Sequence, residues 1–436
     1  MGCAEMRNWK RIFVCLVVFV LALLLATACS LAGSENRTAQ LELAETTRPS
    51  DLAHGPIVRI TIPEAVNTGF GEAVDVSGDT LVVGATDWNV GSGDQFGSVY
   101  VYERVEGEWR QQARLMSSDG QDGFQYDQHF GRSVAIEGDT IVVGAPDADD
   151  PEAGDNTGAV YVYKRAGDTW EEFAKLEAGE PRPHDRFGNL VRLDGATLAI
   201  AGDQDDALHV FVWDGHTWAQ QARLAFPLPP AGEWRQISLA LYSDTLAAGA
   251  TENVPFFSLE GSGTVFIYQR QGEAWSQSAR LEGARDFGVS LALGSSPAAQ
   301  GGQADTLIVG AGADSSAGLY AGAVHVYVRQ GNNWAEQARL AAADAMMDLP
   351  PPTNNTFFGS SVALQGDVLL VGSRFASAVF IYQGQGASWT DQLKAIIDQG
   401  PGEFEAWPLA IDGGTVVRGS PGEFGNSAHV FEIFTR

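Results

Sequence analysis

Cysteine is nearly absent from this chain. Its 436 residues include three, Cys3, Cys15 and Cys29, and all of them precede residue 30. The remaining sequence can therefore form no internal disulfide bond and carry out no thiol chemistry. Histidine is scarce as well, and none of the seven stands in a His-x-His or His-Glu-x-x-His cluster. No Gly-x-Ser-x-Gly nucleophile turn occurs either. These absences weigh against an enzyme of the common metal-dependent or serine-dependent kinds.

Positive charge is also in short supply. Twenty-seven Lys and Arg residues face 55 Asp and Glu residues, which gives a formal net charge of −28. A surface this acidic repels nucleic acid and anionic lipid headgroups, so we expect no nucleic-acid partner. The same charge favours solubility and attracts cations. A solvated extracellular surface is the simplest explanation of it.

A long internal repeat dominates the sequence. The phrase at residues 70–85 returns almost unchanged at residues 130–145, and weaker copies begin at Phe187, Phe287 and Phe358. Two degenerate copies align at residues 235–236 and 405–406. Seven copies at a long period indicate one supersecondary unit that is used many times.

Each repeat is predicted to form four strands. In the second repeat these are residues 133–136, 140–144, 159–164 and a strand ending at Leu176. Two-residue Gly-Asp links are typical of hairpins. The strands are apolar on both faces, and no helical pattern exists to cover them. Small four-stranded sheets must therefore stack on one another, as they do in a β-propeller.

The two ends of the repeat region complement each other. The seventh repeat stops at its third strand, residues 428–434, while residues 57–62 form an orphan strand before the first repeat. The orphan strand can complete the seventh blade and remove an exposed edge. We therefore predict an all-β, seven-bladed propeller over residues 57–436. The alternatives are an open solenoid or two separate β-sandwiches. In either of them the missing fourth strand of the seventh repeat and the extra N-terminal strand would match only by coincidence.

The N-terminus has the pattern of an export signal. Arg7, Lys10 and Arg11 precede an apolar run at residues 12–25, which is short for a membrane span. Residues 26–29 resemble the lipobox of bacterial lipoproteins, in which the cysteine is lipidated. We expect a signal peptide at residues 1–28, lipid attachment at Cys29 and a flexible tether at residues 29–56. The alternative is ordinary secretion after cleavage near Ala28.

The repeat resembles a known family. The pairing of Phe130-Gly131 with Gly144-Ala145-Pro146 is similar to the FG-GAP repeat, in its bacterial form, which builds the propeller at the head of integrin α subunits. The resemblance implies a seven-bladed propeller. The integrin-type repeat carries a calcium loop between its first two strands, but here that position is a bare turn such as Gly138-Asp139. The calcium role of that loop is therefore not expected.

Long loops are expected on one face only, because alternating strands place the tight turns on the other. Variable loops on a rigid scaffold are where binding residues concentrate. Their aromatic side chains could stack on a sugar or anchor a protein, or they could pack the loops against each other. These candidates are Trp88, Phe96, Phe124, Tyr126, Phe256, Phe257 and Tyr320.

Two acidic loops are candidate cation sites. One contains Asp147, Asp149 and Asp155, and the other contains Asp87 and Asn89. Calcium prefers several carboxylate and carbonyl oxygens, which both loops offer. Neither loop has the Asp-x-Asp-x-Asp-Gly order, so no ion at all is the alternative.

Three functions fit these observations. The first is a non-enzymatic adhesion propeller, lipid-anchored in the bacterial cell envelope, which binds a protein or glycan at the cell surface. The second is an extracellular enzyme acting on polysaccharide, with catalytic carboxylates around the central channel. The third is a structural module of a surface layer. Carboxylate pairs facing the channel would favour the enzyme, whereas aromatic residues on the rim would favour adhesion.

Overall fold

The computed structural model describes residues 52–62, 68–86, 97–119, 128–227, 236–252, 261–297, 303–341, 356–374, 378–385, 388–396, 407–420 and 427–435. All of these lie in one compact unit, residues 50–436. No helix in these ranges is long and apolar enough to cross a membrane. The predicted signal peptide and Cys29 lie outside the described residues.

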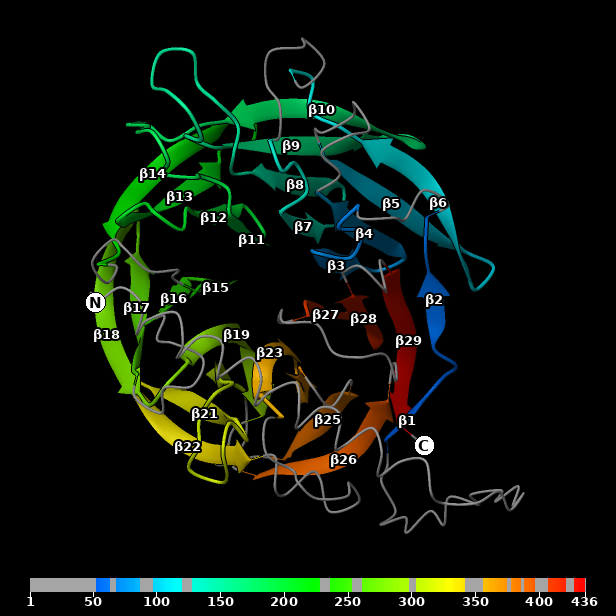
Figure 1. Ribbon diagram of the computed structural model, residues 1–436, viewed down its shortest axis with the longest axis vertical. Helices are drawn as coiled ribbons and strands as arrows, with labels where there is room; N and C mark the ends of the chain where they lie inside the picture. The colour runs from blue at the N-terminus through cyan, green and yellow to red at the C-terminus, as the bar shows by residue number, and fades with distance from the viewer. Residues whose placement is uncertain are drawn as a thin grey trace, which may run out of the picture. The chain divides into compact units, whose positions relative to one another are not determined.

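Seven antiparallel sheets form a ring in this unit, and each blade runs outward from its first strand to its fourth (Figure 1). This confirms the predicted seven-bladed propeller. The strands of blades 1 to 4 are β3 (Val74–Ser77), β4 (Thr80–Ala85), β5 (Ser98–Val105) and β6 (Glu108–Leu115); β7 (Ser133–Glu137), β8 (Thr140–Ala145), β9 (Ala159–Ala166) and β10 (Thr169–Leu176); β11 (Leu190–Asp194), β12 (Thr197–Ala201), β13 (Ala207–Trp213) and β14 (Trp218–Ala225); β15 (Gln236–Tyr242), β16 (Thr245–Thr251), β17 (Gly263–Gln271) and β18 (Ala274–Gly283).

The remaining blades have the same plan. Their strands are β19 (Phe287–Pro297), β20 (Gln303–Ala311), β21 (Ala323–Gln330) and β22 (Asn333–Ala341); β23 (Phe358–Gln365), β24 (Val368–Ser373), β25 (Ala378–Gln385) and β26 (Ser388–Ile396); and β27 (Leu409–Asp412), β28 (Thr415–Ser420) and β29 (Ser427–Thr435), with β1 (Leu52–His54) and β2 (Val58–Ile60). The first strands contact one another in the order β3, β7, β11, β15, β19, β23, β27, and β27 contacts β3. The ring is therefore closed.

The N-terminal segment completes the seventh blade. Both β1 and β2 pair with β29, with Leu52 opposite Thr435 and Val58 opposite Val430. The other six blades each have a β-bulge at the matching place between the third and fourth strands, such as Val101/Tyr102 in blade 1. The break between β1 and β2 corresponds to this bulge. The blade begins at Leu52, inside the segment 29–56 that we expected to be tether, because residues 52–54 find partners on β29.

The Phe-Gly pairs hold neighbouring blades together. The Phe130 side chain is fully buried and meets the Tyr161 ring edge-on at 5.5 Å. Gly131 lies against Gly84 of the preceding blade so closely that a Cβ on Gly84 would lie 2.1 Å from the Gly131 carbonyl oxygen. Gly419 of blade 7 approaches the Gly71 carbonyl in the same way, which joins the last blade to the first. Both faces of every sheet are packed, as the apolar strands predicted.

Candidate functional site

The two faces of the ring differ in the way the sequence predicts. The turns from first to second strand are tight on one side, as at Gly78 and Gly138, which both have a positive φ. We call this side the turn face. In blade 5, where the sequence has an insertion, β19 and β20 lengthen into a longer hairpin that pairs Ser296 with Ala304. The loops between second and third strands and the connections between blades lie on the other side, the loop-rich face.

One backbone position recurs on the loop-rich face. The residue before each described Phe-Gly pair has left-handed backbone geometry, with φ between 50° and 63° at Gly69, His129, Arg186, Asp286 and Phe357. Such geometry disfavours residues with a side chain and often marks functional positions. The same backbone conformation occurs at a glycine and at four residues whose side chains end in an imidazole, a guanidinium, a carboxylate and a phenyl ring.

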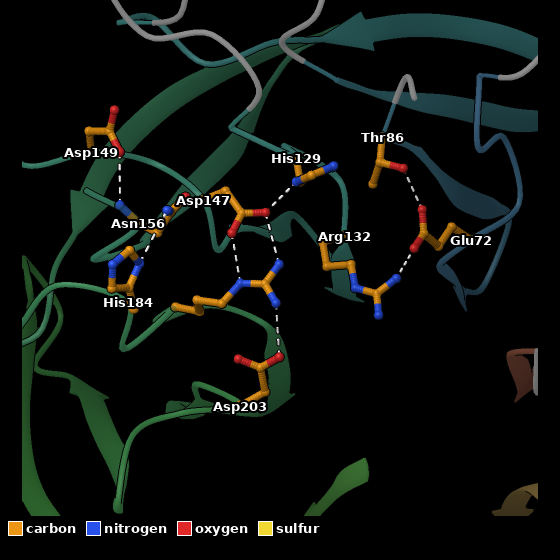
Figure 2. A network of polar contacts seen from close by, with 10 residues as sticks. Glu72, Thr86, His129, Arg132, Asp147, Asp149, Asn156, His184 and Asp203 are labelled. Atoms are coloured by element: carbon orange, nitrogen blue, oxygen red, sulfur yellow. Dashed lines mark hydrogen bonds and ion pairs between the residues drawn. The ribbon is translucent and has the colours of Figure 1, made fainter. Parts of the chain in front are cut away.

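Two of these positions belong to a polar network (Figure 2). The Arg186 guanidinium donates from Nε and Nη2 to the two carboxylate oxygens of Asp147, at 2.7 and 2.9 Å, and from Nη1 to Asp203 at 2.9 Å. His129 Nδ1 contacts Asp147 as well. Asp147 lies between β8 and β9, whereas Asp203 lies between β12 and β13, so the network ties the loops of blades 2 and 3.

The network also sets the charges of its members. Burial opposes ionisation of Asp147, but hydrogen bonds from His129 and Arg186 outweigh it and lower the pKa of that carboxyl. For Asp203, burial is the stronger effect and raises the pKa, although Arg186 opposes it. An ionised Asp147 beside a charged Arg186 is therefore the stable state near neutral pH. This site is built to hold loops in place, with its main carboxylate already satisfied.

The acidic loop at residues 147–155 uses its oxygens within the protein. Asp149 accepts a hydrogen bond from the Asn156 amide at 2.8 Å, and Asp155 is exposed with its backbone oxygen bonded to the His184 amide. Among the described residues, no three acidic, His or Cys side chains gather as a metal site would require. The candidates Asp87 and Asn89 lie outside the described residues, so calcium at that loop stays a prediction.

Of the aromatic candidates, Tyr320 is the one that the structure describes. Its side chain is 4% exposed and stacks on Phe357 at 5.5 Å, with the Arg285 guanidinium 5.2 Å from the ring. Tyr320 thus packs its own loop and presents no open ring face to a ligand, which corrects its assignment as a binding residue. The six that lie outside the described residues are Trp88, Phe96, Phe124, Tyr126, Phe256 and Phe257.

A cavity of about 560 Å³ runs along the ring axis, lined by the first strands. The middle position of each strand is alanine in five blades, but it is Asp75 in blade 1 and Arg192 in blade 3. Burial raises the pKa of Asp75 to about 6, although backbone hydrogen bonds from Ile136 and Val76 oppose the rise. Carboxylates around the channel were expected from the sequence, but Asp75 was not among the expected site residues.

Three other acidic side chains along this channel accept hydrogen bonds from backbone amides of a neighbouring blade. Glu137 accepts a hydrogen bond from the Gly195 amide at 2.6 Å, and Asp194 accepts one from the Ser243 amide at 2.6 Å. Asp412 accepts one from the Gly78 amide at 2.6 Å across the joint between last and first blade. These carboxylates therefore connect neighbouring blades along the turn face.

Sequence reasoning did not single out Arg186, His129 or Asp203. A signal existed, since aligning the repeats places a different residue before each Phe-Gly pair while the flanking positions stay constant. An alignment of the repeats does not show which residues Arg186 contacts. Its partners Asp147 and Asp203 lie in loops of different length that belong to different blades.

Comparisons with known proteins agree with this architecture. The FG-GAP repeat family model matches residues 64–102 and 109–163. No curated protein matches the sequence significantly. Among solved structures, the WD40 domain of coronin from Toxoplasma gondii is similar at 10% identity, with a TM-score of 0.51 and coverage of 89% of this chain and 87% of that chain. A polysaccharide lyase is similar at 11% identity and a TM-score of 0.48, covering 88% and 99%. At such identities the likeness concerns the fold alone.

Proposed function

We propose that this chain, which is an FG-GAP repeat propeller, is a non-enzymatic binding protein that recognises a protein or glycan partner through its loop-rich face. The observation that carries the proposal is the position before each Phe-Gly pair. A scaffold that keeps one backbone geometry at the loop junctions while varying the side chain there is suited to recognition, because the loops that it supports are held by different contacts in different blades. The matching positive-φ position in the tight turns of the opposite face is glycine in five blades and Ser243 in a sixth, so it varies much less.

The network around Arg186 supports the same conclusion. A binding surface needs loops that are already ordered, since ordering them during association costs affinity. Arg186, Asp147 and Asp203 fix three loop segments of two blades before any partner arrives. The aromatic residues predicted in the neighbouring loops would then supply the anchors of an interface, within a polar rim.

The proposed setting is the bacterial cell envelope, outside the cytoplasm, with the propeller held to a membrane by lipid on Cys29. Replacing Cys29 with Ser should then release the protein into the soluble fraction, because a signal peptide without a lipid acceptor leaves no anchor. Cell fractionation with antibody detection of both variants measures this. Equal membrane retention of Cys29→Ser would contradict lipidation, and ordinary secretion would release wild type and variant alike.

The binding proposal is tested by screening the full-length protein on a glycan array and against surface proteins, with and without calcium. A specific partner should lose binding at least tenfold on Trp88→Ala or Phe257→Ala, since truncated aromatic anchors commonly cost about 2 kcal/mol or more. Asp168→Ala, an exposed substitution on the turn face, is the matched control and should change nothing. Turnover of a polysaccharide without any specific binding would contradict the proposal.

A further inference from the structure

A second cavity lies between blades 4 and 5 on the outer rim, at its turn-face end. It measures about 190 Å³. Strands β17 and β18 provide one wall, with Gln269, Gln271, Ser276 and Ser278, and the start of blade 5's outer hairpin provides the other, with Trp334. Its lining is made of amides, hydroxyls, one indole and the guanidinium of Arg329.

This cavity exists because one residue of the repeat is smaller than its counterparts. In blades 1 and 3 the bulge between the third and fourth strands carries a glutamine, and the tryptophan of the next blade donates to it. Trp170 Nε1 donates to Gln112 at 3.0 Å, and Trp275 Nε1 donates to Gln221 at 2.9 Å. In blade 4 the bulge residue is Ser278, whose hydroxyl donates to the Ile267 carbonyl instead. The space that a glutamine would fill is left open beside Trp334.

The face of Trp334 is also left open. In blades 2 and 4 an arginine covers the tryptophan, with Arg165 lying 4.6 Å from the Trp170 ring and Arg270 lying 5.4 Å from the Trp275 ring. The corresponding Arg329 donates to the Gly331 carbonyl at 2.9 Å and to Asp305 at 3.1 Å. Across the described ranges, no cation is placed over Trp334. Two departures from the repeat therefore coincide at one seam.

We propose that this pocket, which we call the rim pocket, binds one uncharged sugar ring by stacking it on Trp334. The apolar face of a pyranose packs on an indole, while its hydroxyls need paired donors and acceptors. The Gln271 and Asn332 amides and the Ser276 hydroxyl have no partner among the described residues and line the cavity. An aromatic ring can therefore contact the apolar face of the sugar while the amide and hydroxyl groups around it bond to the sugar hydroxyls.

Size and charge narrow the ligand further. A volume near 190 Å³ is below the roughly 300–1,000 Å³ typical of drug-sized sites, so it takes a single ring. The guanidinium in the lining belongs to Arg329 and is already paired with Asp305, so no free cation awaits a carboxylate. The protein's net charge of −28 disfavours acidic sugars as well. This site is separate from the loop-rich face, and either could fail without the other.

The test uses saturation-transfer NMR on the full-length protein at pH 7 with methyl glycosides of glucose, galactose, mannose and N-acetylglucosamine, and with methyl glucuronide. We expect transfer to at least one neutral glycoside, strongest at the ring protons that face the indole, and none to the glucuronide. Ser278→Gln fills the pocket with the side chain that other blades use and gives Trp334 an acceptor. It should therefore abolish transfer without lowering the unfolding temperature.

Two further variants make the result specific. Trp334→Ala should abolish transfer, whereas Glu171→Ala, an exposed substitution on the outer strand of blade 2, should leave it unchanged. Absence of transfer to every neutral glycoside overturns the proposal, as does transfer that survives Ser278→Gln. Preferential transfer to the glucuronide overturns the assignment to uncharged sugars. Retention of transfer in both Ser278→Gln and Trp334→Ala would place sugar binding at another site, such as the loop-rich face.

Discussion

At the scale of single residues, the most constrained position of the repeat is the glycine that six of the seven blades carry in the second strand; blade 3 has Ala201 there. Gly84, Gly310 and Gly419 each approach the backbone of the next blade to a distance at which a Cβ would overlap a carbonyl oxygen. The constraint is contact between blades, since none of the three has a positive φ. It explains why this glycine persists in six blades whose other positions differ.

Gly84→Ala should therefore destabilise the propeller strongly. The added methyl would lie 2.1 Å from the Gly131 oxygen, and backbone on both sides resists movement. We expect a loss of about 3 kcal/mol, at the upper end of overpacking costs. The control is Gly78→Ala, where nothing lies within 4 Å of the added Cβ and only the positive φ is penalised, by about 1 kcal/mol. Urea unfolding of both variants measures the difference, and equal losses would contradict the contact argument.

Asp75 should make stability depend on pH. Its pKa in the folded state is raised to about 6, mainly by burial, despite backbone hydrogen bonds and Arg192, while Asp412 adds to the rise. A raised carboxyl pKa means that the folded protein binds the proton more tightly than the unfolded chain does. The contribution of Asp75 to stability therefore improves as the pH falls from about 7 towards 4, and the cost of burying its charge is fully present above pH 7.

Comparison with Asp75→Asn isolates this effect, because asparagine stays uncharged throughout. The stability of the variant relative to wild type should be more favourable at pH 8 than at pH 5, whatever constant penalty the lost hydrogen bond imposes. Chemical unfolding at several pH values between 5 and 8 gives that difference. A difference that does not vary with pH would show that Asp75 titrates in its ordinary range.

At the scale of secondary-structure elements, the outer seams between blades depend on the bulge residue. Gln112 and Gln221 at this place each accept a hydrogen bond from the tryptophan of the next blade. Blade 2 has Phe173 at this place, 45% exposed, and Trp218 Nε1 is buried with no partner. Trp389 Nε1 is likewise buried without a partner, although blade 5 has Gln337 at the bulge. A repeat that is uniform in backbone thus has outer seams that differ in their hydrogen bonds.

Two reciprocal substitutions test the seam. Gln112→Leu removes the acceptor of Trp170 and should cost about 1–3 kcal/mol, the usual penalty for a buried polar group without a partner. Phe173→Gln should supply an acceptor to Trp218 and raise stability by about 1 kcal/mol. Part of that gain is offset by the ring contact of Phe173 with Trp213. Thermal unfolding measures both, and a destabilising Phe173→Gln would show that the ring contact matters more than the hydrogen bond.

At the scale of the whole molecule, closure is carried by the ends of the chain. β1 and β2 are far from β29 in sequence but pair with it, and Gly71, Asp412 and Arg104 reach across the same joint. Because each blade packs on two neighbours, opening one joint exposes apolar surface on blades 1 and 7 together. Stability is therefore a property of the ring, which the N-terminal segment completes.

Deleting residues 52–62 should lower the unfolding temperature of the entire propeller. Loss of the buried Ile60 and Ile62 side chains alone removes roughly 3–6 kcal/mol, and β29 becomes an exposed edge. Deleting residues 30–40, a segment of equal length that precedes β1, is the control and should leave unfolding unchanged. Calorimetry distinguishes the two. An unaltered single transition in the first deletion would contradict closure by these strands.

The sequence by itself determined the architecture, because repetition multiplies a weak local signal seven times. The Phe-Gly and Gly-Ala pairs, the Gly-Asp turns and the orphan N-terminal strand were sufficient for blade number, strand order and closure. They were less informative at the boundary of blade 7, where Leu52–His54 looks like tether until β29 offers it a partner. A three-residue strand whose partner lies hundreds of residues away in the chain has no local sequence pattern that identifies it as a strand.

Only the tertiary structure decided which side chains meet. Arg186 finds Asp147 and Asp203 because blades 2 and 3 lie side by side, and Tyr320 is hidden by Phe357 from the following connection. The rim pocket depends on Ser278 and Trp334 of neighbouring blades, which no single repeat contains. A repeat fixes geometry within its own length, whereas binding sites in a ring form between repeats, where loops of unequal length and single substitutions combine.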